Sequence, residues 1–121
     1  MLKSLIVKLV VKSRLSIRLE NIKKEIIKSE LLSCGKNLNI DLPVTIKNAQ
    51  NIFIGNNVGI ASFVHIWGGG GLTIDDNVLI ASHCAIITET HDYNAEFIYK
   101  SYQKSPIYIS KNVWIGSHTV I

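Results

Sequence analysis

An aliphatic residue recurs every six positions through most of this chain. The repeat runs in three blocks of three isoleucines: Ile54, Ile60, Ile66; Ile74, Ile80, Ile86; and Ile109, Ile115, Ile121. Four places after most of them comes a small or β-branched residue: Val58, Val64, Gly70, Val78, Cys84, Thr90, Val113 and Thr119. A period of six fits neither a helix nor a simple strand alternation. It predicts a parallel β-helix of hexapeptide repeats, in which three short strands form one triangular coil of about eighteen residues.

The residues between the aliphatic positions agree with this fold. Gly, Asn and Asp supply the tight bends at the corners, which often need a positive φ. Each coil buries its aliphatic side chains only against neighbouring coils, so stability accumulates along the stack. Ile121 is itself in the inward register, and no polar cap follows it. We therefore expect residues 36–121 to form a β-helix that is incomplete at its C-terminus, as the front part of a longer solenoid or a shortened relative of one.

Residues 1–35 have a different pattern and are expected to form an amphipathic helical arm. Two apolar stripes run along it: Leu2, Leu5, Ile6 and Leu9, then Leu15, Leu19, Ile22 and Ile26. Spacings of three and four residues place each stripe on one helical face, in one long helix or two short ones. We favour a stripe that packs on the solenoid or on a neighbouring subunit. The alternative is a basic amphipathic segment that rests on an anionic membrane surface.

Charge is distributed unevenly and limits the classes of partner. The formal net charge is +4, but residues 1–36 carry nine Lys or Arg against three Glu, whereas the rest carries four basic and six acidic residues. The basic character therefore belongs to the arm. Basic and aromatic residues do not alternate along the coils, so nucleic acid binding is not expected.

Targeting signals and cysteines favour a cytoplasmic protein. Lys8 and Lys12 interrupt the apolar run after Met1, and no small-residue cleavage site follows. Two cysteines do not make a disulfide framework. Residues 48–74 are uncharged over a length that could span a bilayer, but they are rich in Asn and Gly, so we do not expect a membrane span. The membrane alternative for the arm would place the protein at the inner membrane surface.

The hexad pattern breaks between Thr90 and Ile107. Residues 91–106 are therefore expected to leave the prism at a corner as an excursion loop, where repeat proteins place binding functions. The loop opens with His91 and Asp92 and carries much of the aromatic content of the chain: Tyr93, Phe97, Tyr99 and Tyr102. The glycine run at residues 68–71 lacks a following strand-to-helix context, so it is interpreted as a flexible corner and not as a phosphate-binding loop.

Two segments resemble the signature segments of the left-handed β-helix acyltransferases. They are LTIDDNVLIASHCAIITETHDYN, residues 72–94, and PIYISKNVWIGSHTVI, residues 106–121. Within that superfamily the segments are most similar to the maltose, galactoside and Nod-factor O-acetyltransferases and to acetyltransferases of polysaccharide biosynthesis. The resemblance covers about residues 38–121. It implies an all-β solenoid, a left-handed parallel β-helix that follows the N-terminal α-helical segment. It also implies a homotrimer that transfers an acetyl group from acetyl-CoA, in clefts between subunits.

The resemblance assigns roles to individual residues. His91 falls on the catalytic base of the family; imidazole titrates near neutral pH and can activate a sugar hydroxyl. The backbone amide of Ser117 would stabilise the oxyanion, and Trp114 would form a wall beside the pantetheine arm. Asp92 either orients His91 or caps the loop. The loop aromatics, Tyr93 and Tyr99 among them, either stack on a sugar ring or pack against a neighbouring subunit. Transfer is direct in this family, so neither an acyl-enzyme nor a metal is expected.

Two further comparisons limit the prediction. A metal site would need His65, His83 and His118 to converge, but the spacing of the coils puts His65 and His83 out of vertical register. Where galactoside acetyltransferases present an Asn and an Asp to the sugar, this chain has Ala61 and Gly69. The sequence therefore predicts an O-acetyltransferase of a different sugar, of a polysaccharide precursor or of a lipid-linked saccharide. The alternative is an inactive, truncated β-helix that serves as a structural or assembly module.

Overall fold

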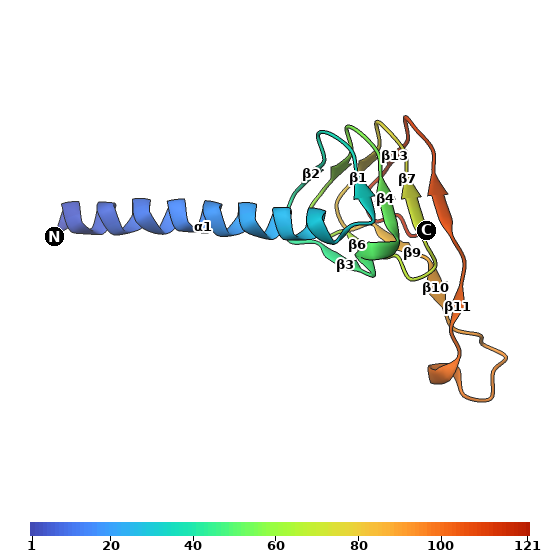
Figure 1. Ribbon diagram of the computed structural model, residues 1–121. Coiled ribbons are helices and arrows are strands. Elements are labelled where there is room, and N and C mark those ends of the chain that lie inside the picture. Colours follow the sequence, from blue (N-terminus) through green and yellow to red (C-terminus); the bar gives the residue numbers. More distant parts are fainter.

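The structure, a computed structural model, describes all 121 residues. A long helix, α1 (Leu2–Glu30), projects from one end of a three-sided stack of short strands. A two-stranded hairpin, β10 (Glu89–Thr90) and β11 (Gln103–Lys104), leaves the stack near the opposite end (Figure 1). The stack therefore separates the N-terminal arm from the excursion loop.

Three parallel sheets form the sides of the stack, which we name faces A, B and C. Face A contains β1 (Ser33–Cys34), β4 (Ile52–Ile54), β7 (Leu72–Ile74) and β12 (Ile107–Ile109). Face B contains β2 (Asn39–Ile40), β5 (Gly59–Ile60), β8 (Leu79–Ile80) and β13 (Trp114–Ile115). Face C contains β3 (Thr45–Lys47), β6 (His65–Trp67) and β9 (Ala85–Ile87), which a single bridge joins to Val120. This arrangement is a left-handed parallel β-helix, and it confirms the predicted fold class.

Each regular coil contains 20 residues, two more than the hexad period predicts. Asn37 Nδ2 donates to Asn57 Oδ1 at 2.8 Å, and these partners are 20 residues apart. The extra residues lie at the corner between faces C and A, in the 3-10 turn η1 (Ala49–Asn51) and in the glycine run at residues 68–71. As a consequence, Gly70 and Thr90 are not buried, in contrast to Val58 and Val64 at the equivalent hexad positions. The buried positions at this corner are Gly68 and Thr88.

The core of the prism consists of the predicted aliphatic residues. Ile54, Ile66, Ile74 and Ile86 have no exposed surface, and Val58, Val64 and Val78 fill the corners. Substitution of a buried isoleucine by alanine typically lowers the free energy of unfolding by about 2–5 kcal/mol, because it leaves a cavity. The inward hexad positions of the two central coils therefore provide most of the packing that holds the stack together.

The corners require left-handed backbone, and the chain meets this requirement in two ways. At the corner between faces A and B the residues with positive φ are asparagines, at positions 37, 57, 77 and 112. This confirms the expected role of Asn, which tolerates left-handed backbone better than most residues. At the corner between faces B and C the residues are Phe63, His83 and His118, with φ of 63°, 62° and 61°. Their rings stack at 5.0 and 4.9 Å, an aromatic ladder that the repeat pattern does not predict.

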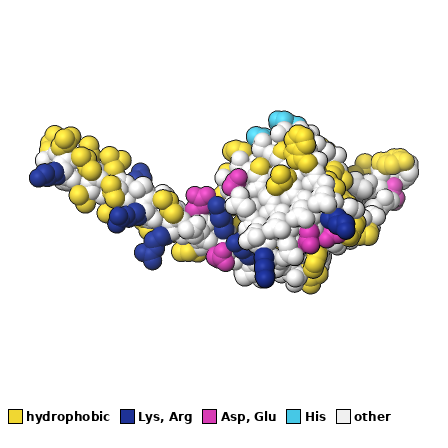
Figure 2. All heavy atoms as spheres, turned by 90° about the horizontal axis from the view of Figure 1, so that it is seen from above, with side chains coloured by type: hydrophobic (Ala, Val, Ile, Leu, Met, Phe, Trp, Pro, Cys, Tyr) yellow, Lys and Arg dark blue, Asp and Glu magenta, His cyan; other side chains and the backbone are white.

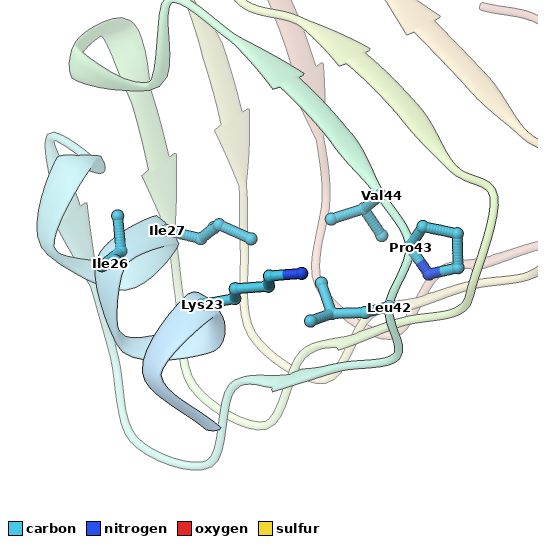
Figure 3. A pocket seen from close by; sticks show the side chains of 6 residues that line it. All are labelled: Lys23, Ile26, Ile27, Leu42, Pro43 and Val44. Carbon is cyan, nitrogen blue, oxygen red and sulfur yellow. The ribbon is translucent and has the colours of Figure 1, made fainter. Parts of the chain in front are cut away.

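The arm is one continuous helix, and most of it stands free of the stack. No residue of α1 is buried, and at about 1.5 Å per residue its 29 residues extend about 43 Å. The second half of the helix faces the β-helix. Ile27 packs against the core, and Ile27 and Lys23 point toward Leu42 and Val44 across a hollow of about 340 Å³ (Figure 3). Within one chain, the expectation that the apolar stripe packs on the solenoid is therefore wrong for the N-terminal turns.

The boundary between arm and β-helix also differs from the expected one. The helix ends at Glu30, and Leu31 is already extended, with φ −66° and ψ 147°. β1 follows at Ser33 and pairs with β4, so the stack begins inside the segment assigned to the arm, residues 1–35. No helix of the chain is long and apolar enough to cross a membrane.

Candidate active site

The excursion loop is a β-ribbon that starts two residues before the expected position. β10 and β11 pair antiparallel, with Glu89 opposite Lys104 and Thr90 opposite Gln103. Lys104 Nζ lies 3.9 Å from Glu89 Oε2 across the ribbon. The ribbon therefore carries the chain away from the prism in a defined direction and holds His91 directly after its first strand.

The glycine run at residues 68–71, which we name the glycine bed, packs against the base of this ribbon. The buried hydroxyl of Thr88 donates to the carbonyl of Trp67 at 2.7 Å and accepts the N–H of Gly70 at 2.8 Å. A Cβ on Gly70 would lie within 2.8 Å of the backbone nitrogen and oxygen of Ser105. Gly71 has a φ of +96°. The expectation of a flexible corner is therefore wrong, because the run is packed closely against both ends of the ribbon.

Two backbone carbonyl groups of the loop bind the imidazole of His91 at Nδ1. Its Nδ1 lies 2.9 Å from the carbonyl oxygen of Ile98 and 2.7 Å from that of Ser101. Carbonyl oxygens only accept hydrogen bonds, so in the neutral imidazole Nδ1 carries the hydrogen and Nε2 has the lone pair. The ring also packs on Tyr102, with ring centroids 4.7 Å apart. This tautomer leaves Nε2 as the atom that can accept a proton.

Asp92 caps the loop and does not contact His91. Its Oδ1 accepts the N–H of Asn94 at 2.9 Å, which is a local turn-forming bond. Of the two roles considered for Asp92, the geometry matches the cap. Ser101 takes part in the same turn, since its Oγ accepts the N–H of Asp92 at 3.0 Å and donates to the carbonyl of Ile98 at 2.8 Å. The sequence did not indicate Ser101, because a backbone carbonyl that binds a side chain leaves no sequence signal.

The loop aromatics separate into two groups. A shallow hollow of about 730 Å³ opens beside His91 and is lined by Ala95, Glu96, Phe97, Ile98, Tyr99 and Tyr102. Tyr99 meets the edge of Phe97 at 6.3 Å, and Lys100 Nζ lies over both rings at 5.4 and 5.5 Å. Tyr93 does not line this hollow and is 84% exposed. Of the two tyrosines considered for acceptor binding, only Tyr99 lies with His91.

Trp114 and Ser117 lie on a different part of the chain from His91. Trp114 lies on the outer side of face B, is 75% exposed, and borders a hollow of about 260 Å³ together with Leu79, Ala61 and Ala81. Ser117 follows at the next corner, and its backbone N–H donates to no group of the chain. His91 and Trp114 thus line separate hollows in one chain. The structure of a single copy does not bring the expected base and the expected acetyl-CoA wall together.

Two of the three histidines outside the loop, His83 and His118, belong to an aromatic stack. His65 pairs with Ala85 on face C, whereas His83 stacks on Phe63 and His118, so the predicted mismatch of His65 and His83 is confirmed. No group of three or more His, Cys, Asp or Glu side chains lies together in a way that could hold a metal ion.

Comparison with known proteins adds two relatives. No protein-family model matches the chain. Galactoside O-acetyltransferase of Escherichia coli is 35% identical over 100 residues, which cover 82% of this chain and 49% of that enzyme. The Saccharomyces cerevisiae protein named "Putative acetyltransferase YJL218W" is 34% identical over 98 residues, which cover 80% of this chain and 50% of that protein.

The coils and the relatives together establish the class. Stacked hexapeptide coils with one N-terminal helix define a left-handed β-helix protein. With both acetyltransferase matches running through most of the chain, it belongs to the hexapeptide-repeat acetyltransferase family. The chain spans about half the length of these two relatives.

Proposed function

We propose that this chain is the part of an acetyl-CoA-dependent O-acetyltransferase that activates the acceptor hydroxyl, with His91 as general base. The observation that carries the proposal is the pair of carbonyl contacts to His91 Nδ1, at 2.9 and 2.7 Å, which leave Nε2 free to accept a proton. An acetyltransferase relative at 35% identity supports the reaction type.

The chemistry follows from the residues in the proposed roles. Nε2 of His91 removes the proton from the acceptor hydroxyl as its oxygen attacks the thioester carbonyl. The negative charge that develops on the carbonyl oxygen needs a preorganised donor, and the unpaired N–H of Ser117 can supply it. Collapse of the tetrahedral intermediate breaks the carbon–sulfur bond and releases the CoA thiolate, which takes the proton from His91. The products are the acetyl ester and CoA, and no acyl-enzyme is formed.

The site is completed by a second copy of the chain in a homotrimer. This part of the proposal rests on the separation of the two hollows, one beside His91 and one beside Trp114. Trp114 is a large apolar side chain that is 75% exposed in a single copy, and an interface between copies would cover it. Each cleft would then combine His91 of one copy with Trp114 and Ser117 of its neighbour.

The acceptor is a sugar or polysaccharide precursor other than a simple galactoside. The name of the Escherichia coli relative points to a sugar acceptor for that protein. In this chain Gly69 lies under the carboxylate of Glu89, so the ribbon occupies the space that a longer side chain at position 69 would need. The aromatic side chains of Tyr99 and Tyr102 beside His91 offer flat apolar surfaces on which a sugar ring can stack. We therefore place the acceptor over this hollow.

The second candidate function is a β-helix module that assembles without catalysis. It is favoured by one observation, that a single copy holds His91 and Trp114 in separate hollows. Binding of acetyl-CoA separates the two functions, since only the enzyme requires it.

The test measures acetyl-CoA binding by calorimetry and CoA release in the presence of a panel of free sugars, with oligomeric state from light scattering. His91→Ala should lower turnover roughly 10²–10⁴-fold, the usual contribution of a general base, and leave the oligomeric state unchanged. His65→Ala, at an exposed histidine on face C, is the matched control and should leave turnover unchanged. Full activity in His91→Ala would exclude His91 as the base. An assembled chain without acetyl-CoA binding would favour the structural module.

A further inference from the structure

The N-terminal half of α1, residues 2–15, borders no hollow with the β-helix. The apolar side chains from Leu2 to Leu19 are all at least 44% exposed. The helix first faces the β-helix at Ser16 and Leu19, which border a hollow with Leu42 and Pro43. Lys23, Ile26 and Ile27 line a second hollow nearer the end of the helix (Figure 3). A helix of this length that exposes so many leucines, isoleucines and valines needs a partner surface to cover them.

One face of this free segment carries no charged residue. Spacings of three and four residues place Leu2, Leu5, Ile6, Leu9 and Ile17 on it, together with Ser13 and Ser16. The two serines do not make this face polar, because their hydroxyls donate within the helix. Ser13 Oγ bonds the carbonyl of Val10 and Ser16 Oγ bonds that of Ser13, both at 2.8 Å.

The charges of the segment are all positive and all lie outside that face. Residues 1–19 contain no Asp or Glu and five basic residues: Lys3, Lys8, Lys12, Arg14 and Arg18. Figure 2 shows apolar side chains over much of the visible side of the free arm, with Lys and Arg mostly along one edge. Acidic residues appear only from Glu20 onward. There they neutralise the cations, with Lys24 3.5 Å from Glu20 and Lys28 3.1 Å from Glu25.

This segregation of charge decides between two partners for the apolar face. A bundle of copies of the same helix would bring five cations per helix together without a single acidic partner, whereas helical bundles normally place opposite charges beside their apolar seam. An anionic lipid surface neutralises the cations and accepts the apolar face at the same time.

We propose that residues 2–19 of α1 lie in the headgroup region of an anionic lipid bilayer. The apolar face enters the acyl boundary, and the basic residues bind lipid phosphates and carboxylates. The segment lies on the membrane and does not cross it. Residues 20–30 of the helix, which carry three Glu and three Lys, remain outside together with the β-helix. This surface is independent of the reaction proposed above.

The test is sedimentation of the full chain with vesicles, without acetyl-CoA. Vesicles of phosphatidylcholine with roughly one third phosphatidylserine should bind the chain, and vesicles of phosphatidylcholine alone should bind it about tenfold less or not at all. Raising the salt concentration should release the chain, since surface charge attraction is screened. Equal binding to both kinds of vesicle, or binding to neither, would overturn the proposal.

Three double variants locate the binding surface. Arg14→Gln with Arg18→Gln removes two cations from the free segment, and Leu5→Ser with Leu9→Ser removes apolar area. Each should weaken binding to anionic vesicles at least about tenfold. Lys24→Gln with Lys28→Gln removes the same charge from residues 20–30 and should leave binding unchanged. Circular dichroism checks that each variant keeps its helix and its β-helix.

Light scattering on the leucine variant tests whether a second copy of the chain, and not a membrane, covers the apolar face. If Leu5→Ser with Leu9→Ser lowers the oligomeric state in the absence of vesicles, the apolar face is covered by a second copy and the proposal fails. An unchanged oligomeric state together with lost vesicle binding supports the membrane surface.

Discussion

The Nδ1 atom of His91 lies 2.7 Å from the carbonyl oxygen of Ser101, ten residues further along the same loop. The contact connects the start of the loop with its later part. The hydroxyl of Ser101 reinforces it, because its Oγ accepts the N–H of Asp92 and donates to the carbonyl of Ile98. One serine therefore determines where the carbonyl that orients the imidazole can lie.

We expect Ser101→Ala to lower turnover by roughly three- to tenfold, the effect of one net hydrogen bond of about 0.5–1.5 kcal/mol. The carbonyl that binds Nδ1 remains in this variant, but the turn that positions it is weaker. Steady-state release of CoA, measured with the acceptor that the sugar screen identifies, checks the effect on kcat.

Ser62→Ala provides the control, because Ser62 lies at a corner and its hydroxyl makes no hydrogen bond in the chain. Its turnover should equal that of the unsubstituted protein. Equal turnover in Ser101→Ala would mean that the hydroxyl of Ser101 does not help to position His91.

Substitution by alanine should destabilise the protein at Gly70 and have almost no effect at Gly116. A Cβ at Gly70 would meet the carbonyl oxygen of Thr88 and the backbone of Ser105, whereas a Cβ at Gly116 has no atom within 4 Å. Gly70→Ala should therefore lower the free energy of unfolding by about 1–3 kcal/mol, the usual cost of overpacking. Urea denaturation followed by circular dichroism measures this difference.

Gly116→Ala is the matched control and should change the free energy of unfolding by less than about 0.5 kcal/mol, as at an open surface position. Limited proteolysis adds a local readout, because displacement of the ribbon should make residues 91–106 easier to cleave in Gly70→Ala. Equal stability of the two variants would contradict the close packing of the glycine bed.

A surface pair on face A should make stability depend on pH. The Tyr108 hydroxyl donates to Asp75 Oδ2 at 2.9 Å. The pKa of Asp75 is lowered below 3.8, first by the N–H of Asp76 and then by this hydroxyl. The hydrogen bond to Asp75 and its negative charge raise the pKa of Tyr108 above 10.0.

The direction of each pKa shift determines the pH range in which the group contributes stability. The lowered pKa of Asp75 contributes stability above pH 3.8, which is lost as the pH falls through the lower pKa of the folded state. The raised pKa of Tyr108 contributes stability below pH 10.0, which is lost as the pH rises toward the higher pKa of the folded state. Tyr108→Phe should thus lower Tm slightly between about pH 4 and 10 and approach the unsubstituted protein at both extremes. Thermal melts across this range measure the difference.

Tyr93→Phe serves as the reference for that series, because the Tyr93 hydroxyl makes no hydrogen bond in the chain and its ring is 84% exposed. Its Tm should follow the unsubstituted protein at every pH. A Tyr108→Phe variant that did the same would show that the bond to Asp75 contributes no stability.

The sequence alone predicted the type of fold and the position of the loop. The hexad of isoleucines indicates a prism because only a three-sided coil returns a side chain to the interior at that period. The break between Thr90 and Ile107 marks the excursion for the same reason. The asparagines at the corners were also predictable, because a local backbone preference acts without any tertiary partner.

The tertiary structure decided the features that depend on contacts between distant residues. The length of a coil depends on the corner between faces C and A, where two additional residues break the period. The stack of Phe63, His83 and His118 requires the register of three coils, and the glycine bed requires the ribbon that covers it.

For His91, too, the sequence determined some properties and the tertiary structure decided others. The sequence determined its identity and its place at the root of the loop, because a break in a repeat is a local pattern. Only the folded loop decided its tautomer, because the carbonyl oxygens of Ile98 and Ser101 reach Nδ1 once the chain has turned back on itself. Backbone carbonyls are the same at every residue, so their positions come from the fold and not from the residue types.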